Sequence, residues 1–261
     1  MAELTVVSLN LLNDLTFWDL RAPLIVAELR RFYPDVIALQ EVALPLNNAQ
    51  WLAEQLGGYT VHLQPKTGAR REHEALALLS RLPVTAPDGL ELIHQDRVAQ
   101  RITVRVGDAP LVIANTHLLA WLTDATPRRE QVRRLLAWLP RDAPVIVCGD
   151  FNALPHFRAI KMMRARFVSA YFAAHGHEPA FTWPTPLDRG KGWRHRAREL
   201  LLRLGGIALR RTPRWCGTLD YIFVDRALTV RACERAFTQP ARDNPRLYPS
   251  DHLGLVARLN W

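Results

Sequence analysis

Acid, amide and imidazole side chains stand at the ends of several apolar runs in this sequence. In residues 145–155, VIVCGDFNALP, a run of β-branched and small residues ends at Asp150, and Asn152 follows two positions later. Such groups at the edge of an apolar core can bind a metal ion or transfer protons. The residues placed in this way are Asn10, Glu41, His117, Asp150, Asn152, Asp220, Asp251 and His252.

The position of these residues relative to their strands predicts that they meet. Of these eight residues, those from Asn10 to Asn152 end or directly follow an apolar run. Asp220 and the pair Asp251 and His252 instead precede one. In an antiparallel arrangement the start of one strand lies beside the end of its neighbour, so both groups can converge on one rim. Taken singly, each residue also has a structural explanation, such as a turn cap, an ion pair or a buried histidine. Their joint placement at strand ends favours a catalytic site.

The remaining pattern predicts the elements that position this rim. Short β-branched runs indicate strands, while Tyr33 and Pro34 mark the end of one helix and Pro127 the start of another. Many strands with few helices between them indicate two stacked sheets flanked by helices. The predicted strands are residues 5–10, 36–41, 59–63, 75–79, 101–106, 111–117, 145–149, 219–224, 228–232 and 253–259, and the predicted helices are 22–32, 127–139 and 155–166.

Length and composition limit the class of protein. The chain has 261 residues, 49% of them hydrophobic, which predicts one domain over residues 1–261. Cys148, Cys216 and Cys233 are widely spaced and form no CxxC pair, which argues against a disulfide framework and a zinc site. The sequence has no secretory signal pattern and no apolar run of about 20 residues. We therefore expect a soluble, monomeric, cytoplasmic protein without a transmembrane segment.

Most of the net charge of +9 lies in one segment. Residues 189–214 contain nine Lys and Arg against one Glu, a net charge of +8, and are predicted to form a basic insertion. This insertion could bind a nucleic-acid backbone, rest on an anionic membrane, or pack its leucines on the domain and leave its arginines in solvent. Its candidate substrate-binding residues are Trp193, Arg194, Arg196 and Arg198.

Short motifs along nearly the whole chain resemble one enzyme family. The motifs are SLN at 8–10, QEV at 40–42, LLSRLPV at 78–84, NTHL at 115–118, GDFN at 149–152, LDYIF at 219–223 and SDH at 250–252. They resemble the endonuclease/exonuclease/phosphatase superfamily, the metal-dependent phosphoesterases that include pancreatic-type DNase, exonuclease III, sphingomyelinases and inositol polyphosphate 5-phosphatases. The resemblance implies a four-layered α/β sandwich, in which two mainly antiparallel sheets pack face to face with helices outside and the active site at one edge.

Two positions depart from the pattern of that family. Exonuclease III-like enzymes usually carry a tyrosine where this chain has His117, so the resemblance favours the DNase, sphingomyelinase and phosphatase-like branches. The sequence REHE, which includes Glu74, precedes the predicted strand 75–79 where relatives often have a small or amide residue. We therefore assign no phosphate contact at that point.

If this rim hydrolyses a phosphoester, it is expected to bind a divalent metal ion. The reaction requires shielding of the phosphoryl oxygens, an in-line water and a stabilised leaving oxygen, and a hard divalent cation serves several of these needs. Mg²⁺, with Mn²⁺ as a second candidate, prefers oxygen ligands. Glu41 is expected to anchor the ion, and Asn10 and Asp251 are expected to assist directly or through water, as the resemblance also implies.

The other rim residues have expected roles in catalysis. Asp150 is expected to accept the proton of the attacking water, while the Asn152 amide orients that water or donates to a phosphoryl oxygen. Side chains two residues apart on an extended segment lie on the same side, which would explain this spacing. His252, paired with Asp220, would face the phosphate as an imidazolium. The alternative makes His252 the base and Asp150 an electrostatic helper. By similarity, His117 contacts the phosphate or assists the leaving group.

These residues predict a metal-dependent phosphoester hydrolase. The first hypothesis is a nuclease or phosphodiesterase that acts on nucleic acid, and the alternative is a phosphatase or phosphodiesterase for a phospholipid headgroup or a small phosphorylated metabolite. A more remote alternative is an inactive binding module with the same fold. Pseudoenzymes usually lose a metal carboxylate or the base, and this chain has both, so the sequence favours an enzyme.

Overall fold

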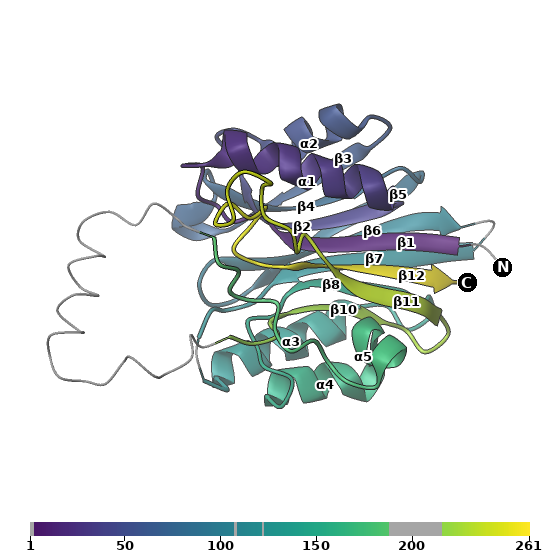
Figure 1. The fold of residues 1–261 in the computed structure, drawn as a ribbon. Coiled ribbons are helices and arrows are strands. Elements are labelled where there is room, and N and C mark those ends of the chain that lie inside the picture. Colours follow the sequence, from purple (N-terminus) through teal and green to yellow (C-terminus); the bar gives the residue numbers. More distant parts are fainter. Residues whose placement is uncertain (1–2, 107–108, 122, 188–215) are drawn as a thin grey trace, which may run out of the picture.

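Two six-stranded β-sheets occupy the centre of the molecule (Figure 1). The computed structural model describes residues 3–106, 109–121, 123–187 and 216–261. The first sheet contains β1 (Glu3–Asn10), β2 (Val36–Ala43), β3 (Thr60–Pro65), β4 (Glu74–Ser80), β11 (Thr229–Ala236) and β12 (Gly254–Asn260), in the order β11-β12-β1-β2-β4-β3. The second contains β5 (Val84–Leu92), β6 (Arg97–Val106), β7 (Ala109–His117), β8 (Val145–Asp150), β9 (Val168–Ser169) and β10 (Asp220–Val224), in the order β5-β6-β7-β8-β10-β9.

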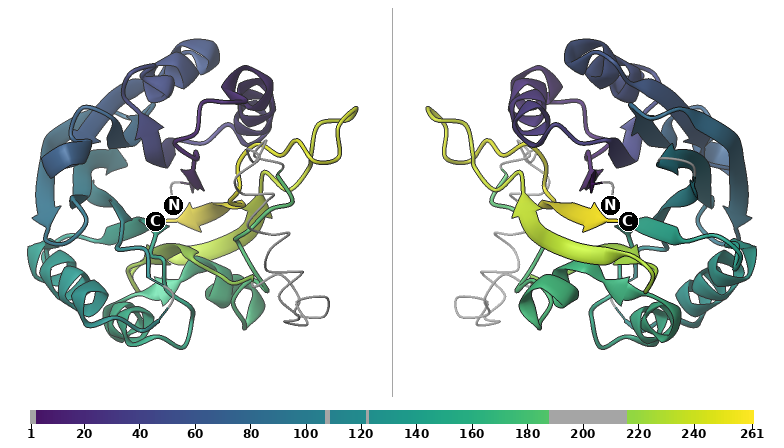
Figure 2. Two further views of the ribbon diagram at one scale, coloured as in Figure 1. Left: turned by 90° about the vertical axis from the view of Figure 1, so that its left-hand side faces the viewer. Right: turned by 90° about the vertical axis from the view of Figure 1, so that its right-hand side faces the viewer.

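Each sheet has one parallel pair near its centre. These pairs are β1–β2 and β7–β8, and the other pairings among the described strands are antiparallel. Glu3 pairs with Asn260, so the two ends of the described chain lie side by side (Figure 2). The prediction of two mainly antiparallel sheets is confirmed.

Helices cover the outer faces of both sheets. The helices α1 (Trp18–Phe32) and α2 (Asn48–Leu56) pack on the first sheet, and α3 (Thr126–Trp138) and α4 (Arg158–Arg166) pack on the second (Figures 1 and 2). The short helix α5 (Ala170–His175) lies near β10 and β11, and a single 3₁₀ turn covers Gly68–Arg70. This arrangement gives the four layers that the sequence predicted. None of the helices in the described residues combines the length and apolarity needed to cross a bilayer.

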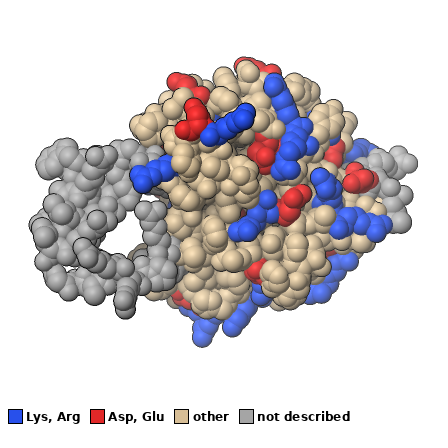
Figure 3. Space-filling model, viewed as in Figure 1, with Lys and Arg blue, Asp and Glu red and all other residues tan. Residues whose placement is uncertain are grey.

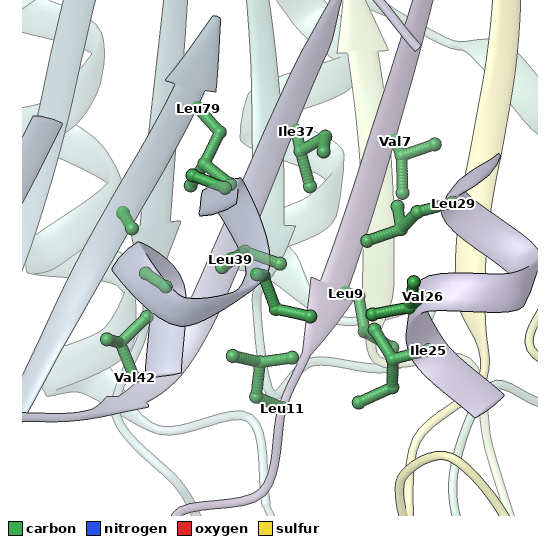
Figure 4. Close-up of a cluster of buried hydrophobic side chains, with 14 of the residues drawn as sticks. Val7, Leu9, Leu11, Ile25, Val26, Leu29, Ile37, Leu39, Val42 and Leu79 are labelled. Carbon is green, nitrogen blue, oxygen red and sulfur yellow. The ribbon is translucent and has the colours of Figure 1, made fainter. Parts of the chain in front are cut away.

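The side chains of the central strands alternate between the two faces of each sheet and form three apolar layers. Neighbouring side chains of a strand point to opposite faces, so Val6 of β1 packs between the sheets whereas Val7 packs against α1. Figure 4 shows Val7 beside Leu29 of α1. The equivalent outer layer of the second sheet joins β8 to α3 and α4. Burial on both faces explains why these strands read as continuous apolar runs.

Some elements differ from the sequence prediction. The strands β5 and β9 and the helices α2 and α5 were not predicted. β5 contains Pro87 and Gly89, which usually indicate a turn, but this strand lies at a sheet edge, where proline is tolerated. α4 begins at Arg158, three residues later than predicted, because a turn from Leu154 to Phe157 precedes it.

Candidate active site

A pocket of about 320 Å³ lies where strand ends of both sheets meet. The two parallel pairs, β1–β2 and β7–β8, bring their carboxyl ends to this edge. β12 and β10 run antiparallel to β1 and β8 and therefore begin at the same edge. The side chains that line the pocket belong to Glu41, Arg97, His117, Ala120, Trp121, Asp150, Asn152, Trp183, Leu219, Asp251 and His252.

The structure brings together the predicted strand-end residues. Most of them line the pocket, and the remaining two, Asn10 and Asp220, are buried and hydrogen-bonded to lining residues. Positive and negative side chains are interspersed over the face seen in Figure 3. The predicted binding residues of the basic segment, Trp193, Arg194, Arg196 and Arg198, lie outside the described residues.

Glu41 projects from an irregularity within β2. The predicted strand ended at Glu41, but β2 continues to Ala43, and its register against β4 shifts between Leu39 and Val42. Glu41 has a positive φ of 56°, a left-handed conformation that is uncommon for residues other than glycine. A bulge of this kind redirects the side chain of the strand, which explains how Glu41 reaches the pocket.

Asn10 connects acidic residues from the two sheets. Its Nδ2 donates to Glu41 Oε1 at 3.3 Å and to Asp150 Oδ2 at 3.1 Å. Glu41 also accepts a hydrogen bond from the Asn13 N–H at 2.9 Å. Burial by itself raises the pKa of Glu41, but the Asn13 N–H and the positive charge of His252 outweigh burial, and the pKa is lowered. Glu41 is therefore ionised at neutral pH.

A tight turn joins Asp150 to Asn152, so the predicted extended segment was wrong. Asn152 has a φ of 48°, and its N–H donates to Asp150 Oδ1 at 2.8 Å. The side chain of Asn152 donates through Nδ2 to the Leu118 carbonyl at 3.1 Å. Phe151, between them, is fully buried. An aspartate that accepts from the N–H two residues later favours a turn, and this turn directs Phe151 into the core.

His117 faces Asp150 across the parallel pair β7–β8, and their Cα atoms are in register. The two strands approach closely because position 149 is glycine. A Cβ on Gly149 would lie 2.1 Å from the Thr116 carbonyl oxygen. The His117 Nε2 lies 3.5 Å from Asp150 Oδ2 and 4.0 Å from Glu41 Oε1. The imidazole therefore lies against the carboxylates of both sheets.

A buried charge cluster that the sequence analysis missed lies on the other side of His117. Glu74 forms an ion pair with Lys66, and its Oε1 lies 3.7 Å from His117 Nδ1. Arg97 is buried and lines the pocket. Burial, followed by the positive charges of Arg97 and Lys66, holds the pKa of His117 well below its ordinary value. His117 is therefore a neutral imidazole at physiological pH.

A signal for this cluster was present in the sequence. Lys66 directly follows β3, Glu74 begins β4 and Arg97 begins β6. The other site residues were identified by the same kind of position, at the end of a strand. We did not infer the cluster because we assigned no phosphate contact near Glu74. Strand 101–106 was also predicted too short to begin at Arg97.

His252 and Asp220 form a hydrogen-bonded pair. The distance from His252 Nδ1 to Asp220 Oδ2 is 3.0 Å, and the Thr182 hydroxyl donates to the same carboxylate oxygen at 2.5 Å. Burial by itself lowers the pKa of His252, but the negative charges of Asp220 and Asp150 outweigh it and raise the pKa to about 9. An imidazolium suits a hydrogen-bond donor better than a general base.

Carboxylates crowd the centre of the pocket. Burial, and then the negative charge of Asp220, raise the pKa of Asp150 to about 7. Asp220 Oδ1 is buried and has no hydrogen-bond partner among the described residues. Asp150, Asp220 and His252 place one possible ligand atom each within 4.8 Å of one another. The His252 Nδ1 is already bonded to Asp220, and Mg²⁺ prefers oxygen ligands, so a trio that includes an imidazole suits this ion less well.

The oxygen atoms around Glu41 fit a hard divalent cation better. Glu41 and Asp251 line the same pocket, and Asn10 bonds directly to Glu41. The Asn10 Oδ1 accepts from the Leu12 N–H at 3.0 Å, and its second lone pair remains available. Carboxylate and amide oxygens are the ligands that Mg²⁺ prefers. The donor set therefore fits such an ion.

The chain belongs to the Endonuclease/Exonuclease/phosphatase family, whose pattern matches residues 7–252. It is 29% identical to human Nocturnin over 276 aligned residues, which cover 94% of this chain and 58% of that protein. It is also 29% identical to human Protein angel homolog 1 over 173 residues, which cover 54% of this chain and 25% of that protein. The chain thus aligns with only part of the length of these relatives.

Solved structures have the same fold. The human Nocturnin catalytic domain with bound sulfate anion superimposes with a TM-score of 0.74 at 26% identity, covering 99% of this chain and 93% of that one. The structure of D. rerio TDP2 complexed with single strand DNA product superimposes with a TM-score of 0.78 at 19% identity, covering 100% of both chains. At 19% identity the second likeness shows the fold alone.

Proposed function

We propose that the protein is a metal-dependent phosphodiesterase that acts on nucleic acid. The observation that carries this proposal is the convergence in one pocket of Glu41, held by Asn10, and of His252, hydrogen-bonded to Asp220. The pocket thus offers a metal anchor and a hydrogen-bond donor for developing negative charge. The similarity to the human Nocturnin catalytic domain with bound sulfate supports the choice, because sulfate and phosphate are both tetrahedral anions.

Glu41 and Asp251, assisted by Asn10, would hold the divalent cation, for which Mg²⁺ is the first candidate. When bound, such an ion neutralises charge on the phosphoryl oxygens. The Asp251 carboxylate is held in place by the Trp183 indole N–H at 3.1 Å. Asn10 keeps Glu41 close to Asp150 through its two N–H donors. Mg²⁺ is usually bound through one or two carboxylates and keeps several waters, which agrees with this ligand set.

Asp150 accepts the proton of the attacking water in this proposal. Its raised pKa of about 7 makes its carboxylate more basic than an ordinary aspartate. His252 donates to a phosphoryl oxygen or to the leaving oxygen, with Asp220 fixing its ring. Neutral His117 is a second donor or acceptor for the phosphate, and Asn152 orients the water or the phosphoryl group. The competing assignment, with His252 as base, requires a neutral imidazole.

The test is hydrolysis in the presence of Mg²⁺ by the purified protein. The substrates are bis-p-nitrophenyl phosphate, p-nitrophenyl phosphate, plasmid and single-stranded DNA, RNA, sphingomyelin and inositol phosphates. We expect cleavage of the diester and of at least one polynucleotide, with loss in excess EDTA. Cleavage confined to sphingomyelin, inositol phosphates or a monoester would instead support a lipid headgroup or small-metabolite substrate. The absence of all hydrolysis, with Mg²⁺ bound, would support an inactive binding module.

The cytoplasmic location of the protein is also a proposal. Cys148 and Cys233 are buried free thiols and Cys216 is an exposed one. Free thiols persist in a reducing compartment, which supports a cytoplasmic location. Measuring whether Cys216 is reduced in cell extracts trapped with an alkylating reagent would test it.

A further inference from the structure

A buried arginine of α1 joins two loops that lie beside Glu41. Arg21, in the first turns of the helix, is only 1% exposed. Its guanidinium donates to the carbonyls of Leu11 at 2.8 Å and of Asp14 at 2.7 Å, in the loop after β1. It also donates to the Pro249 carbonyl at 2.9 Å, in the loop before β12 (Figure 1). One side chain therefore connects segments from opposite ends of the chain.

The loop after β1 holds Asn10 and Glu41 through its N–H groups. The Leu12 N–H donates to Asn10 Oδ1 at 3.0 Å, and the Asn13 N–H donates to Glu41 Oε2 at 2.9 Å. Leu12 has a φ of 62°, a left-handed conformation that is uncommon for leucine. Such a conformation persists only when the surrounding groups hold it in place.

Arg21 fixes the direction of these N–H groups through the carbonyls of the same peptide units. A trans peptide unit is planar, and its C=O and N–H point in opposite directions. The Leu11 carbonyl, bonded to Arg21, shares its unit with the Leu12 N–H. The Leu12 carbonyl accepts from Arg21 at 3.4 Å and shares its unit with the Asn13 N–H. The carbonyls thus face the guanidinium while the N–H groups face the site.

The loop before β12 carries Asp251 and His252. The Ser250 hydroxyl donates to the Asn10 carbonyl at 2.6 Å and accepts from the His252 N–H at 3.2 Å. Asp251 lies between these two residues and lines the pocket. Arg21 binds this loop at the carbonyl directly before Ser250. The same guanidinium therefore holds both loops that contribute to the candidate metal site.

We propose that Arg21 is a positioning residue for the metal site. It sets the spacing between the loop that orients Glu41 and the loop that carries Asp251, and it is not among the residues that line the pocket. A guanidinium presents five donors in a planar fork, whereas a lysine ammonium presents three donors from one point. This inference rests on the proposed function, because the cation that it concerns is the one assigned to Glu41 and Asp251.

Arg128 offers a matched control on the other sheet. It is fully buried near the start of α3 and donates to the carbonyls of Leu119 at 3.1 Å and of Thr123 at 3.0 Å. The loop that it holds, between β7 and α3, contains none of the proposed metal ligands. Replacing either arginine by lysine removes the same kind of hydrogen bonds from an equally buried position.

The test measures Mn²⁺ binding by Arg21→Lys and Arg128→Lys from the electron paramagnetic resonance signal of the free ion. Arg21→Lys should raise the Kd for Mn²⁺ about tenfold or more, the effect of losing a hydrogen bond to a charged group. Arg128→Lys should change it by less than about threefold. An equal rise in both variants, or no rise in Arg21→Lys, would show that Arg21 serves stability alone and would overturn the inference. Arg21→Met, which keeps the stem without the donors, should raise the Kd further than Arg21→Lys.

Amide hydrogen exchange tests the positioning without a metal ion. In Arg21→Lys the N–H groups of Asn13 and His252 should exchange about tenfold faster than in the unmodified protein, because the loops that carry them open more often. Arg128→Lys should leave both rates close to those of the unmodified protein. If the unmodified protein binds no Mn²⁺, the proposed function is wrong, and amide exchange decides the inference by itself. Unchanged protection of the Asn13 N–H in Arg21→Lys would then overturn it.

Discussion

Phe151 tests whether packing of the core holds the catalytic turn in place. It lies between Asp150 and Asn152 and is fully buried. Its ring makes edge-to-face contacts with Tyr221, at 5.6 Å between centroids, and with Phe223, at 5.2 Å. Truncating a buried phenylalanine to alanine usually costs about 3–5 kcal/mol. Two aromatic contacts place this position toward the upper half of that range.

The variants Phe151→Ala and Phe151→Leu should therefore differ clearly. Phe151→Ala should reduce the free energy of unfolding by about 4 kcal/mol, which corresponds to a fall in Tm of about 8–16 °C for a domain of this size. Phe151→Leu should cost less than about 1.5 kcal/mol because most of the volume is retained.

Urea unfolding would measure the stabilities, and hydrolysis of bis-p-nitrophenyl phosphate would measure activity at a temperature where both variants are folded. We expect Phe151→Ala to lose activity per folded molecule as well as stability, because the turn that holds Asp150 and Asn152 loses its anchor. Phe151→Leu should stay within about threefold of the unmodified protein. A cost below about 1 kcal/mol for Phe151→Ala would refute the reasoning from packing.

Three further predictions concern metal, catalysis and the basic segment. Glu41→Gln should lower the rate and raise the Mg²⁺ concentration for half-maximal rate, whereas the exposed Glu54→Gln should change neither; full activity in excess EDTA would contradict the metal requirement. Asp150→Asn and His252→Ala should each lower the rate at least about a hundredfold with the fold intact by circular dichroism, and a near-normal rate for Asp150→Asn would assign the base to His252. Replacing four arginines by glutamine should weaken nucleic-acid binding and reduce its log–log salt slope by about 0.9 per lost duplex phosphate contact, or about 0.7 for single strands. Loss of binding to anionic liposomes alone would favour a membrane, and no change in either would leave a solvated surface. The four arginines are Arg194, Arg196, Arg198 and Arg203.

The sequence by itself predicted the layers and the edge that carries the site. Apolar runs identify strands because burial on both faces of a central strand favours apolar residues at most of its positions. A polar residue at the end of such a run therefore marks the edge of the sheet. This local rule placed Asn10, His117 and Asp150 correctly at strand ends, and antiparallel neighbours then brought His252 to the same edge. The rule works because strand direction and side-chain alternation are set by the backbone.

Conformation at single residues was decided by the tertiary structure. The bulge at Glu41 and the turn at Asn152 both use left-handed backbone that the residue types do not specify. Such conformations persist because neighbouring strands, a buried carboxylate and the packing of Phe151 over-determine them. The edge strand β5 was missed for a related reason, since Pro87 is tolerated only because no second strand needs its N–H.

Charge states also required the tertiary structure. Lys66, Glu74 and Arg97 lie at or next to the ends of three different strands, but a strand-end position by itself does not show that they form one charge cluster beside His117. The opposite pKa directions of His117 and His252 depend on which charges lie within a few ångströms after burial. The sequence supplies the ionisable groups. Folding fixes the distances between them and excludes the water that would otherwise screen their charges and keep each pKa near its ordinary value.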